Sequence, residues 1–219
     1  MVTASWDLGR RSLSFQRRPL VMAILNVTPD SFSDGGLYDQ PNLAIDAALR
    51  MQSEGADIID IGGESTRPYS DPLSASDELA RVMPVIDALA GRLSIPISID
   101  TSKATVAEAA IAAGAEIIND VTGLEGDPRM PSVAAEHEVG VCVMHMRGTP
   151  QTMQDDPRYD DVVEEICDYL VRRRQFCLAQ GIAAQRICLD PGIGFGKSHE
   201  HNLQLLRATR RLVDLGSPI

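Results

Sequence analysis

Six short apolar runs recur along the chain, and each ends in polar residues and is followed by a stretch with helical spacing of its apolar residues. The runs are LVMAILNVT from residue 20, DIIDIGGEST from 57, IPISIDTS from 95, EIINDV from 116, VGVCVMHM from 139 and ICLDPGIGFG from 187. Regular strand–helix alternation indicates a parallel α/β sheet, and polar residues at the strand C-termini indicate a ligand site at that edge. The sequence therefore predicts an α/β fold.

The number of units predicts an open (β/α) barrel of the TIM type. A closed barrel has eight strand–helix units and roughly 250 residues, whereas this chain has 219 residues and six units. No linker or low-complexity stretch interrupts the series, and the chain would be entering a seventh strand after the segment 216–219. We expect a single domain over residues 1–219 that lacks the last two strand–helix units.

The segments between the apolar runs predict where helices begin and end. Pro41 suits the first turn of the first helix, and the later helices are expected near 131–138, 159–180 and 199–214. Four glycines, each between a helical segment and a strand, are expected to end helices in the left-handed conformation: Gly55, Gly114, Gly140 and Gly181. An alternating stretch at 12–15 predicts a short strand or hairpin at the barrel floor.

Composition narrows the class of partner. The chain is 44% apolar and 23% charged, as in ordinary globular proteins, and its net charge of -11 argues against nucleic acid or anionic lipid as a partner. No stretch approaches the roughly 18 apolar residues of a membrane span, and residues 1–18 lack the apolar centre of a secretory signal. We therefore expect a cytoplasmic protein without a membrane partner. The four cysteines lack metal-site spacing and are expected in or near the core.

The strand ends hold the candidate chemistry. Their polar residues are Asn26, Thr66, Asp100, Asn119, His145 and Asp190. A single aspartate at a strand end is often only a turn former, but three carboxylate or amide groups in register favour a site. Such a pocket has hydrogen-bond acceptors and donors and little fixed positive charge. It suits a neutral planar ring, such as a heterocycle with an amino group beside a ring N–H.

Two loops after the first strands are candidate binding loops. LNVTPDSFSDGG is too long for a simple connection, which is typical of a lid or binding loop. In GGESTRPYS, Arg67 is placed to meet a phosphate or carboxylate, although a surface arginine is an equally good interpretation. DPGIGFGK does not have the spacing of a nucleotide-binding phosphate loop.

The motifs LNVTPDSFSDGG, GGESTRP, SIDT, INDV and LDPGIGFGK, in this order, resemble dihydropteroate synthase from about residue 20 to the end. The resemblance implies a TIM barrel that joins 6-hydroxymethyl-7,8-dihydropterin diphosphate to p-aminobenzoate in folate biosynthesis. It also implies release of pyrophosphate, a Mg²⁺ cofactor and competition by sulfonamides. Homodimers are expected for the complete barrel.

The resemblance implies a pterin site on the later strands. Asp190 would bind the pterin amino group and the adjacent ring N–H, and Asn119 and Asp100 would complete the hydrogen bonds of the ring. Asp100 would also place negative charge near the carbon that becomes cationic as diphosphate leaves. Met144 and Phe195 would pack near the faces of the ring.

The resemblance places the diphosphate and p-aminobenzoate at the first two loops. Asn26 would help to hold the Mg²⁺–diphosphate. Thr66, Arg67 and Pro68 belong to the loop that resembles the diphosphate and p-aminobenzoate site, and Arg67 would act in catalysis beside the departing diphosphate. Phe32 on the first loop would help to close over the site.

Three functions are consistent with these motifs. The first is a dihydropteroate synthase. The second is a non-catalytic pterin-binding protein, because the Ser-Arg-Lys and Arg-x-His motifs that follow in the family are not among these 219 residues. The third is a pterin-dependent methyltransferase relative, against which the loop LNVTPDSFSDGG argues.

Overall fold

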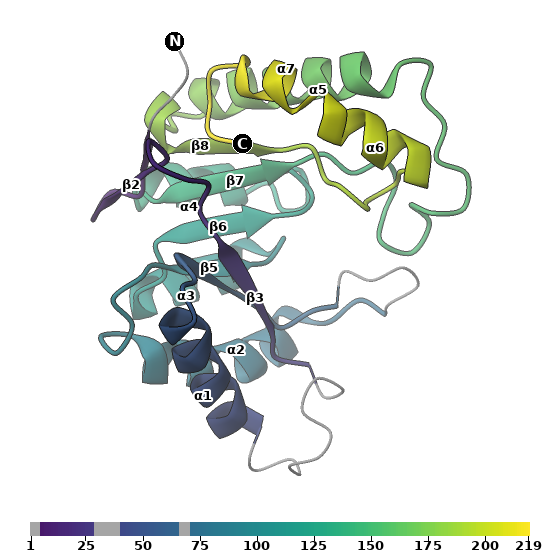
Figure 1. The fold of residues 1–219 in the computed structure, drawn as a ribbon. Coiled ribbons are helices and arrows are strands. Elements are labelled where there is room, and N and C mark those ends of the chain that lie inside the picture. The colour runs from purple at the N-terminus through teal and green to yellow at the C-terminus, as the bar shows by residue number, and fades with distance from the viewer. Residues whose placement is uncertain (1–4, 29–39, 66–70) are drawn as a thin grey trace.

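The computed structural model describes residues 5–28, 40–65 and 71–219. A sheet of six parallel strands follows chain order from β3 to β8 (Figure 1). The strands are β3 (Met22–Asn26), β4 (Ile58–Gly62), β5 (Ile97–Asp100), β6 (Ile117–Asp120), β7 (Gly140–Met144) and β8 (Ile187–Asp190). The predicted α/β class and the six parallel strands are confirmed, and no closed barrel forms among the described residues.

Helices follow the strands and cover the outer face of the sheet (Figure 1). They are α1 (Gln40–Ser53), α2 (Ala75–Leu89), α3 (Ala104–Ala113), α4 (Met130–Glu136), α5 (Val162–Ala179), α6 (His199–Arg207) and α7 (Thr209–Val213), with a short 3-10 helix, η2 (Ala184–Arg186), before β8. The helix expected over 199–214 is divided into α6 and α7 at Ala208. The order of polar and apolar residues in this stretch does not indicate the break.

The two faces of the sheet differ. β4 and β7 are buried at every position, as expected of inner parallel strands with helices on one face and a barrel interior on the other. β3 and β8 are the two outer strands of the sheet, and Ile24 on β3 is 62% exposed. Beside β8, the N–H of Leu189 donates to the carbonyl of Pro218 at 2.9 Å. The C-terminal segment therefore begins to pair where a further strand would lie, as the sequence predicted.

A short antiparallel pair, β1 (Ser5–Asp7) and β2 (Ser12–Ser14), confirms the predicted hairpin at the floor of the sheet. Trp6 is buried, and its indole N–H donates to the carbonyl of Arg186 at 2.8 Å. The expected helix-ending role of Gly140 is wrong, because this residue begins β7 and the left-handed residue of the connection is Glu138 (φ 55°). A Cβ at Gly140 would lie 2.5 Å from Leu8, so the glycine makes room for the hairpin segment.

Two further expectations from composition can be compared with the fold. All four cysteines are buried free thiols, as predicted. No helix among the described residues is long and apolar enough to cross a membrane.

Candidate active site

The C-terminal ends of the strands bring the predicted polar residues together. Strand register places Asn26 opposite Gly62, Gly62 opposite Asp100, and Asp100 opposite Asn119. At the other end of the sheet, Met144 lies opposite Asp190. A single edge therefore presents two carboxylates and two amides, as the sequence predicted.

Asn26 and Asp100 face the same gap, because Gly62 between them has no side chain. A Cβ built on Gly62 would lie 3.6 Å from Asn26 Oδ1 and 3.3 Å from Asp100 Oδ2. An amide oxygen and a carboxylate oxygen are ligands that Mg²⁺ accepts, usually with oxygens of a substrate phosphate. This pair could therefore hold a magnesium ion together with a diphosphate. Among the described residues, no cluster of three or more His, Cys, Asp or Glu side chains provides a self-sufficient metal site.

Asp100 is surrounded by other carboxylates. Burial, followed by the charges of Asp60, Asp120 and two glutamates, raises the pKa of Asp100 well above its usual value. The mouth of the barrel therefore crowds carboxyl groups whose charged forms are costly, and a ligand that brings N–H donors or developing positive charge would stabilise those charged forms.

The carboxylate of Asp190 is oriented so that it can accept hydrogen bonds from a ligand. Its Oδ1 accepts the N–H of Gly192 at 2.7 Å, which fixes the orientation of the carboxylate. Burial raises the pKa of Asp190, while the Gly192 N–H and the charge of Lys197 act in the opposite direction. With one oxygen fixed by the backbone, the second oxygen and the remaining lone pair of the first are available to a ligand.

The loop after β8 packs tightly on the end of β7. Gly192 has φ +68°, and a Cβ there would lie only 2.0 Å from the carbonyl oxygen of His145. Phe195 is half-buried in this loop, and Met144 is buried beneath it. Phe195 thus lies in the loop that follows Asp190, and Met144 lies opposite Asp190 on the neighbouring strand β7. Their contact with a pterin ring stays a prediction.

Lys197 is a buried cation that the sequence did not assign to the site. It is 3% exposed, and its Nζ lies 2.8 Å from the carbonyl oxygen of Phe195 and 3.3 Å from that of His145. Nδ1 of His145 lies 3.2 Å from the same atom. Burial lowers the pKa of Lys197 to about 7, although the charge of Asp190 raises it. Lys197 thus ties the loop that contains Phe195 to the end of β7.

His145 is turned toward this cluster. Its ring packs edge-on against Tyr169 with centroids 4.8 Å apart, and it is 6% exposed. Burial, together with the charges of Lys197 and Arg147, lowers the pKa of His145 to about 3. His145 is therefore neutral at ordinary pH and supports the loop.

Asp60 is a second residue that sequence reasoning missed. It lies on β4, is 3% exposed, and its Oδ2 accepts the Nδ2–H of Asn119 at 2.9 Å. Burial raises its pKa, and Ser98 and Asn119 oppose that effect. The available signal was an aspartate within the apolar run IIDIG, on the same strand face as Gly62.

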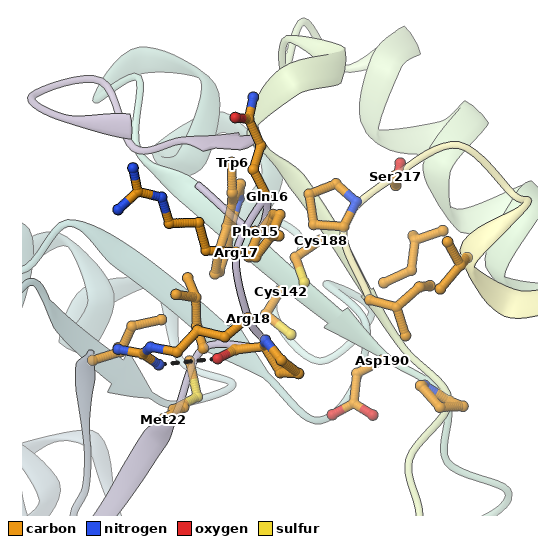
Figure 2. A pocket seen from close by; sticks show the side chains of 18 residues that line it. Trp6, Phe15, Gln16, Arg17, Arg18, Met22, Cys142, Cys188, Asp190 and Ser217 are labelled. Atoms are coloured by element: carbon orange, nitrogen blue, oxygen red, sulfur yellow. Dashed lines mark hydrogen bonds between the residues drawn. The ribbon is translucent and has the colours of Figure 1, made fainter. Parts of the chain in front are cut away.

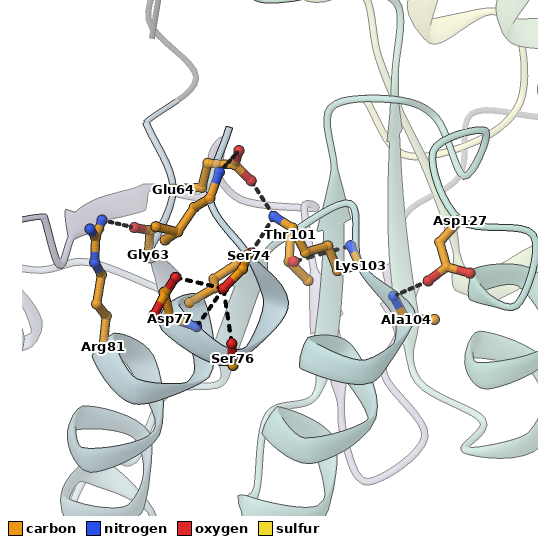
Figure 3. Close-up of polar contacts among 12 residues, drawn as sticks. Gly63, Glu64, Ser74, Ser76, Asp77, Arg81, Thr101, Lys103, Ala104 and Asp127 are labelled. Carbon is orange, nitrogen blue, oxygen red and sulfur yellow. Dashed lines mark hydrogen bonds and ion pairs between the residues drawn. The ribbon is translucent and has the colours of Figure 1, made fainter. Parts of the chain in front are cut away.

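A third missed group connects the second loop to the strand that follows it. Lys103 forms an ion pair with Glu64 (Figure 3). It forms a second ion pair, at 2.6 Å, with the fully buried Glu78. Glu64 also accepts the N–H of Leu73 at 2.9 Å. Partial burial disfavours charge on Lys103, but both hydrogen-bonded glutamates outweigh it and raise its pKa. The network fixes the ends of this loop beside Asp100.

Several predicted site residues lie outside the described residues. They are Phe32, Thr66, Arg67 and Pro68. Their assignments therefore stay predictions.

A cavity of about 700 Å³ runs along the open side of the sheet (Figure 2). Its walls include Met22 of β3 and Cys142 and Cys188 of the last two strands, and Trp6 lies at its floor. Asp190 lies on its rim. The barrel interior is thus connected with the strand ends where the polar residues gather.

The chain has an open parallel (β/α) fold with carboxylates and amides at its strand ends, and its residues 22–219 match the pterin binding enzyme family. The chain belongs to the dihydropteroate synthase family, whose members are transferases of folate biosynthesis.

Similar proteins support this assignment. The dihydropteroate synthase of Neisseria meningitidis serogroup C is 46% identical over 217 residues, covering 98% of this chain and 76% of the relative. A Xanthomonas albilineans dihydropteroate synthase solved with 4-aminobenzoic acid superposes with a TM-score of 0.91 at 46% identity, covering 99% of this chain and 76% of that one. The same enzyme in complex with 7,8-dihydropteroate gives a TM-score of 0.86 at 43% identity, covering 98% and 75%. The chain thus spans about three quarters of the length of these relatives.

Proposed function

We propose that the chain condenses 6-hydroxymethyl-7,8-dihydropterin diphosphate with p-aminobenzoate to give 7,8-dihydropteroate and pyrophosphate. The observation that carries this proposal is the set of acceptor groups at one mouth, formed by Asp100, Asn119 and Asp190. A pterin ring is planar and rich in N–H donors, which suits such a mouth. Similar proteins solved with 4-aminobenzoic acid and with 7,8-dihydropteroate support both substrates.

Each polar residue has a task in this reaction. The carboxylate of Asp190, fixed by the Gly192 N–H, would accept hydrogen bonds from the pterin amino group and the ring N–H beside it. Asn119 and Asp100 would complete the polar contacts of the ring. Met144 and Phe195 would provide apolar surface for its faces. Together these contacts orient the pterin so that its exocyclic carbon faces the second substrate.

The chemical step exchanges one bond for another at that carbon. The C–O bond to diphosphate breaks and its electron pair leaves with diphosphate, while the amine nitrogen of p-aminobenzoate forms the new C–N bond and loses a proton to water. Positive charge develops on the carbon as the leaving group departs. The carboxylate of Asp100 would stabilise that charge without reorganisation, because its position is already fixed by the fold.

The diphosphate would lie near the first two loops. Asn26 and Asp100, whose side-chain oxygens lie on either side of Gly62, would provide two oxygen ligands for a magnesium ion. A bound magnesium ion supplies positive charge to the diphosphate oxygens. Thr66, Arg67 and Pro68 belong to the loop that would bind the diphosphate and p-aminobenzoate, with Arg67 beside the diphosphate, and Phe32 would help to cover the site. These four assignments, and competition by sulfonamides, rest on the family resemblance.

The test is pyrophosphate release. The chain is incubated with the dihydropterin diphosphate and Mg²⁺, with and without p-aminobenzoate, and product is followed by chromatography. Asp100→Asn should lower turnover by about 100-fold, the order expected for losing one preorganised electrostatic group. Asp87→Asn, which changes an exposed carboxylate on α2, is the matched control and should leave turnover unchanged.

The test also separates the alternative functions. Pterin binding without release of pyrophosphate would favour a non-catalytic pterin-binding protein. Failure to bind the pterin would contradict the assignment of the site. We place the reaction in the cytoplasm and expect a homodimer for the complete barrel, which size-exclusion chromatography with light scattering would check.

A further inference from the structure

Asp60 is a buried carboxylate beneath the mouth whose hydrogen bonding is incomplete. Its Oδ2 accepts one bond, from Nδ2 of Asn119, and its Oδ1 has no partner among the described residues. Ser98 lies directly across from it on β5 and is fully buried. A carboxylate in such surroundings is costly to keep, since buried acceptors without partners lose their hydration. Because its one hydrogen bond is with Asn119, we expect Asp60 to act through that residue.

The contact determines which end of the Asn119 amide faces a ligand. A carboxylate oxygen accepts hydrogen bonds, so it holds the NH₂ end of the amide and disfavours the oxygen end. With one N–H of Asn119 directed to Asp60, the groups left for a ligand are Oδ1 and the second N–H. The half-exposed Asn119 therefore presents an acceptor and a donor side by side.

One edge of a reduced pterin ring has the matching pattern. In 7,8-dihydropterin, a ring N–H lies next to a bare ring nitrogen, whereas the fully oxidised ring has two bare nitrogens at these positions. A fixed amide oxygen attracts the N–H of the reduced ring and repels the bare nitrogen of the oxidised one.

We propose that Asp60 is a positioning residue that makes the site select the dihydropterin ring over the oxidised pterin ring by holding the amide of Asn119 in one orientation. The inference rests on the proposed function, because it concerns the same ring in the same pocket. Loss of Asp60 would free the amide to turn its NH₂ group toward the bare nitrogens of an oxidised ring. Selectivity between the two rings, rather than affinity alone, would then fall.

The experiment compares two ligands by calorimetry, 6-hydroxymethyl-7,8-dihydropterin and fully oxidised 6-hydroxymethylpterin. The unmodified chain should bind the reduced ring more tightly. In Asp60→Asn, the new amide can hold either end of Asn119. The dissociation constant of the oxidised ring divided by that of the reduced ring should therefore fall about tenfold, the factor expected for one hydrogen bond. Ser98→Ala alters the neighbour of Asp60 and leaves the contact with Asn119 in place, so it should keep the ratio of the unmodified chain.

Each outcome decides a specific question. If the unmodified chain binds neither ring, the proposed function fails. If it binds both and Asp60→Asn weakens them equally, Asp60 is only structural and the inference is overturned while the proposed function stands. If Asp60→Asn does not fold, NMR of the unmodified chain replaces it. One side-chain amide proton of Asn119 should exchange slowly with solvent, and fast exchange of both would overturn the inference.

Discussion

Stability of the fold should rise between pH 7 and pH 9 because of Lys197. Burial lowers the pKa of Lys197 to about 7, from an ordinary value of 10.5 that applies in the unfolded chain. Between these values the unfolded chain binds a proton at this position and the folded chain does not. The free energy of unfolding therefore increases with pH across this window.

The size of the change in stability follows from the difference between the pKa values of Lys197 in the folded and unfolded chains. A full proton difference changes stability by about 1.4 kcal/mol per pH unit, so the step from pH 7.5 to pH 9 should add roughly 2 kcal/mol. The buried thiols of Cys142, Cys167 and Cys177, whose pKa values are raised above the ordinary value of 9, act with the opposite sign, and their effect on the unmodified chain grows as pH approaches 9. Measurements should therefore stop at pH 9.

Urea unfolding of the unmodified chain and of Lys197→Met at pH 7.5, 8.25 and 9 isolates this contribution. The unfolding free energy of the unmodified chain minus that of Lys197→Met should increase with pH. Lys103→Met is the matched control, because Glu64 and Glu78 raise the pKa of Lys103 and it stays charged in both states over this range. That variant should lower stability by an amount that does not depend on pH. Parallel stability curves for the unmodified chain and Lys197→Met would refute the reasoning.

Two further changes test the loop after β8. Asp190→Asn should weaken binding of 6-hydroxymethyl-7,8-dihydropterin by at least about tenfold in calorimetry, because an amide presents N–H to a ring donor and leaves it unsatisfied; unchanged affinity would contradict the assignment. Gly192→Ala should lower the free energy of unfolding by more than about 2 kcal/mol in urea, since a Cβ would clash with the carbonyl of His145 at positive φ. Gly194→Ala also has positive φ but open space around it, so it should cost only about 1 kcal/mol, and an equal loss in both variants would show that the clash is absent.

The polar residues at the strand ends were predictable because two rules of sheet structure apply there together. Alternation fixes which face each strand residue occupies, and parallel pairing brings all C-termini to one edge. Asn26, Asp100, Asn119 and Asp190 could therefore be placed from their positions alone. The break between α6 and α7 was not predictable, because no proline or glycine marks Ala208.

The supporting residues were harder to find, because their importance depends on contacts between distant segments. Asp60 is 59 residues from its partner Asn119, and Lys197 is 52 residues from His145. Lys103 reaches back across 39 residues to Glu64. No local pattern indicates such pairs. A charged residue within or beside an apolar run is the only local signal, and it does not identify the partner.

The contact between Lys197 and His145 can persist in either charge state of the lysine. A charged ammonium group donates three hydrogen bonds, to the carbonyl oxygens of Phe195 and His145 and to the lone pair on Nδ1. A neutral amine donates to the same two carbonyls and accepts from Nδ1–H, provided that the imidazole proton moves from Nε2 to Nδ1. Since His145 is neutral, this exchange of tautomers is open to it. The lysine can therefore lose its proton without release of the loop, and the position of Phe195 becomes independent of pH.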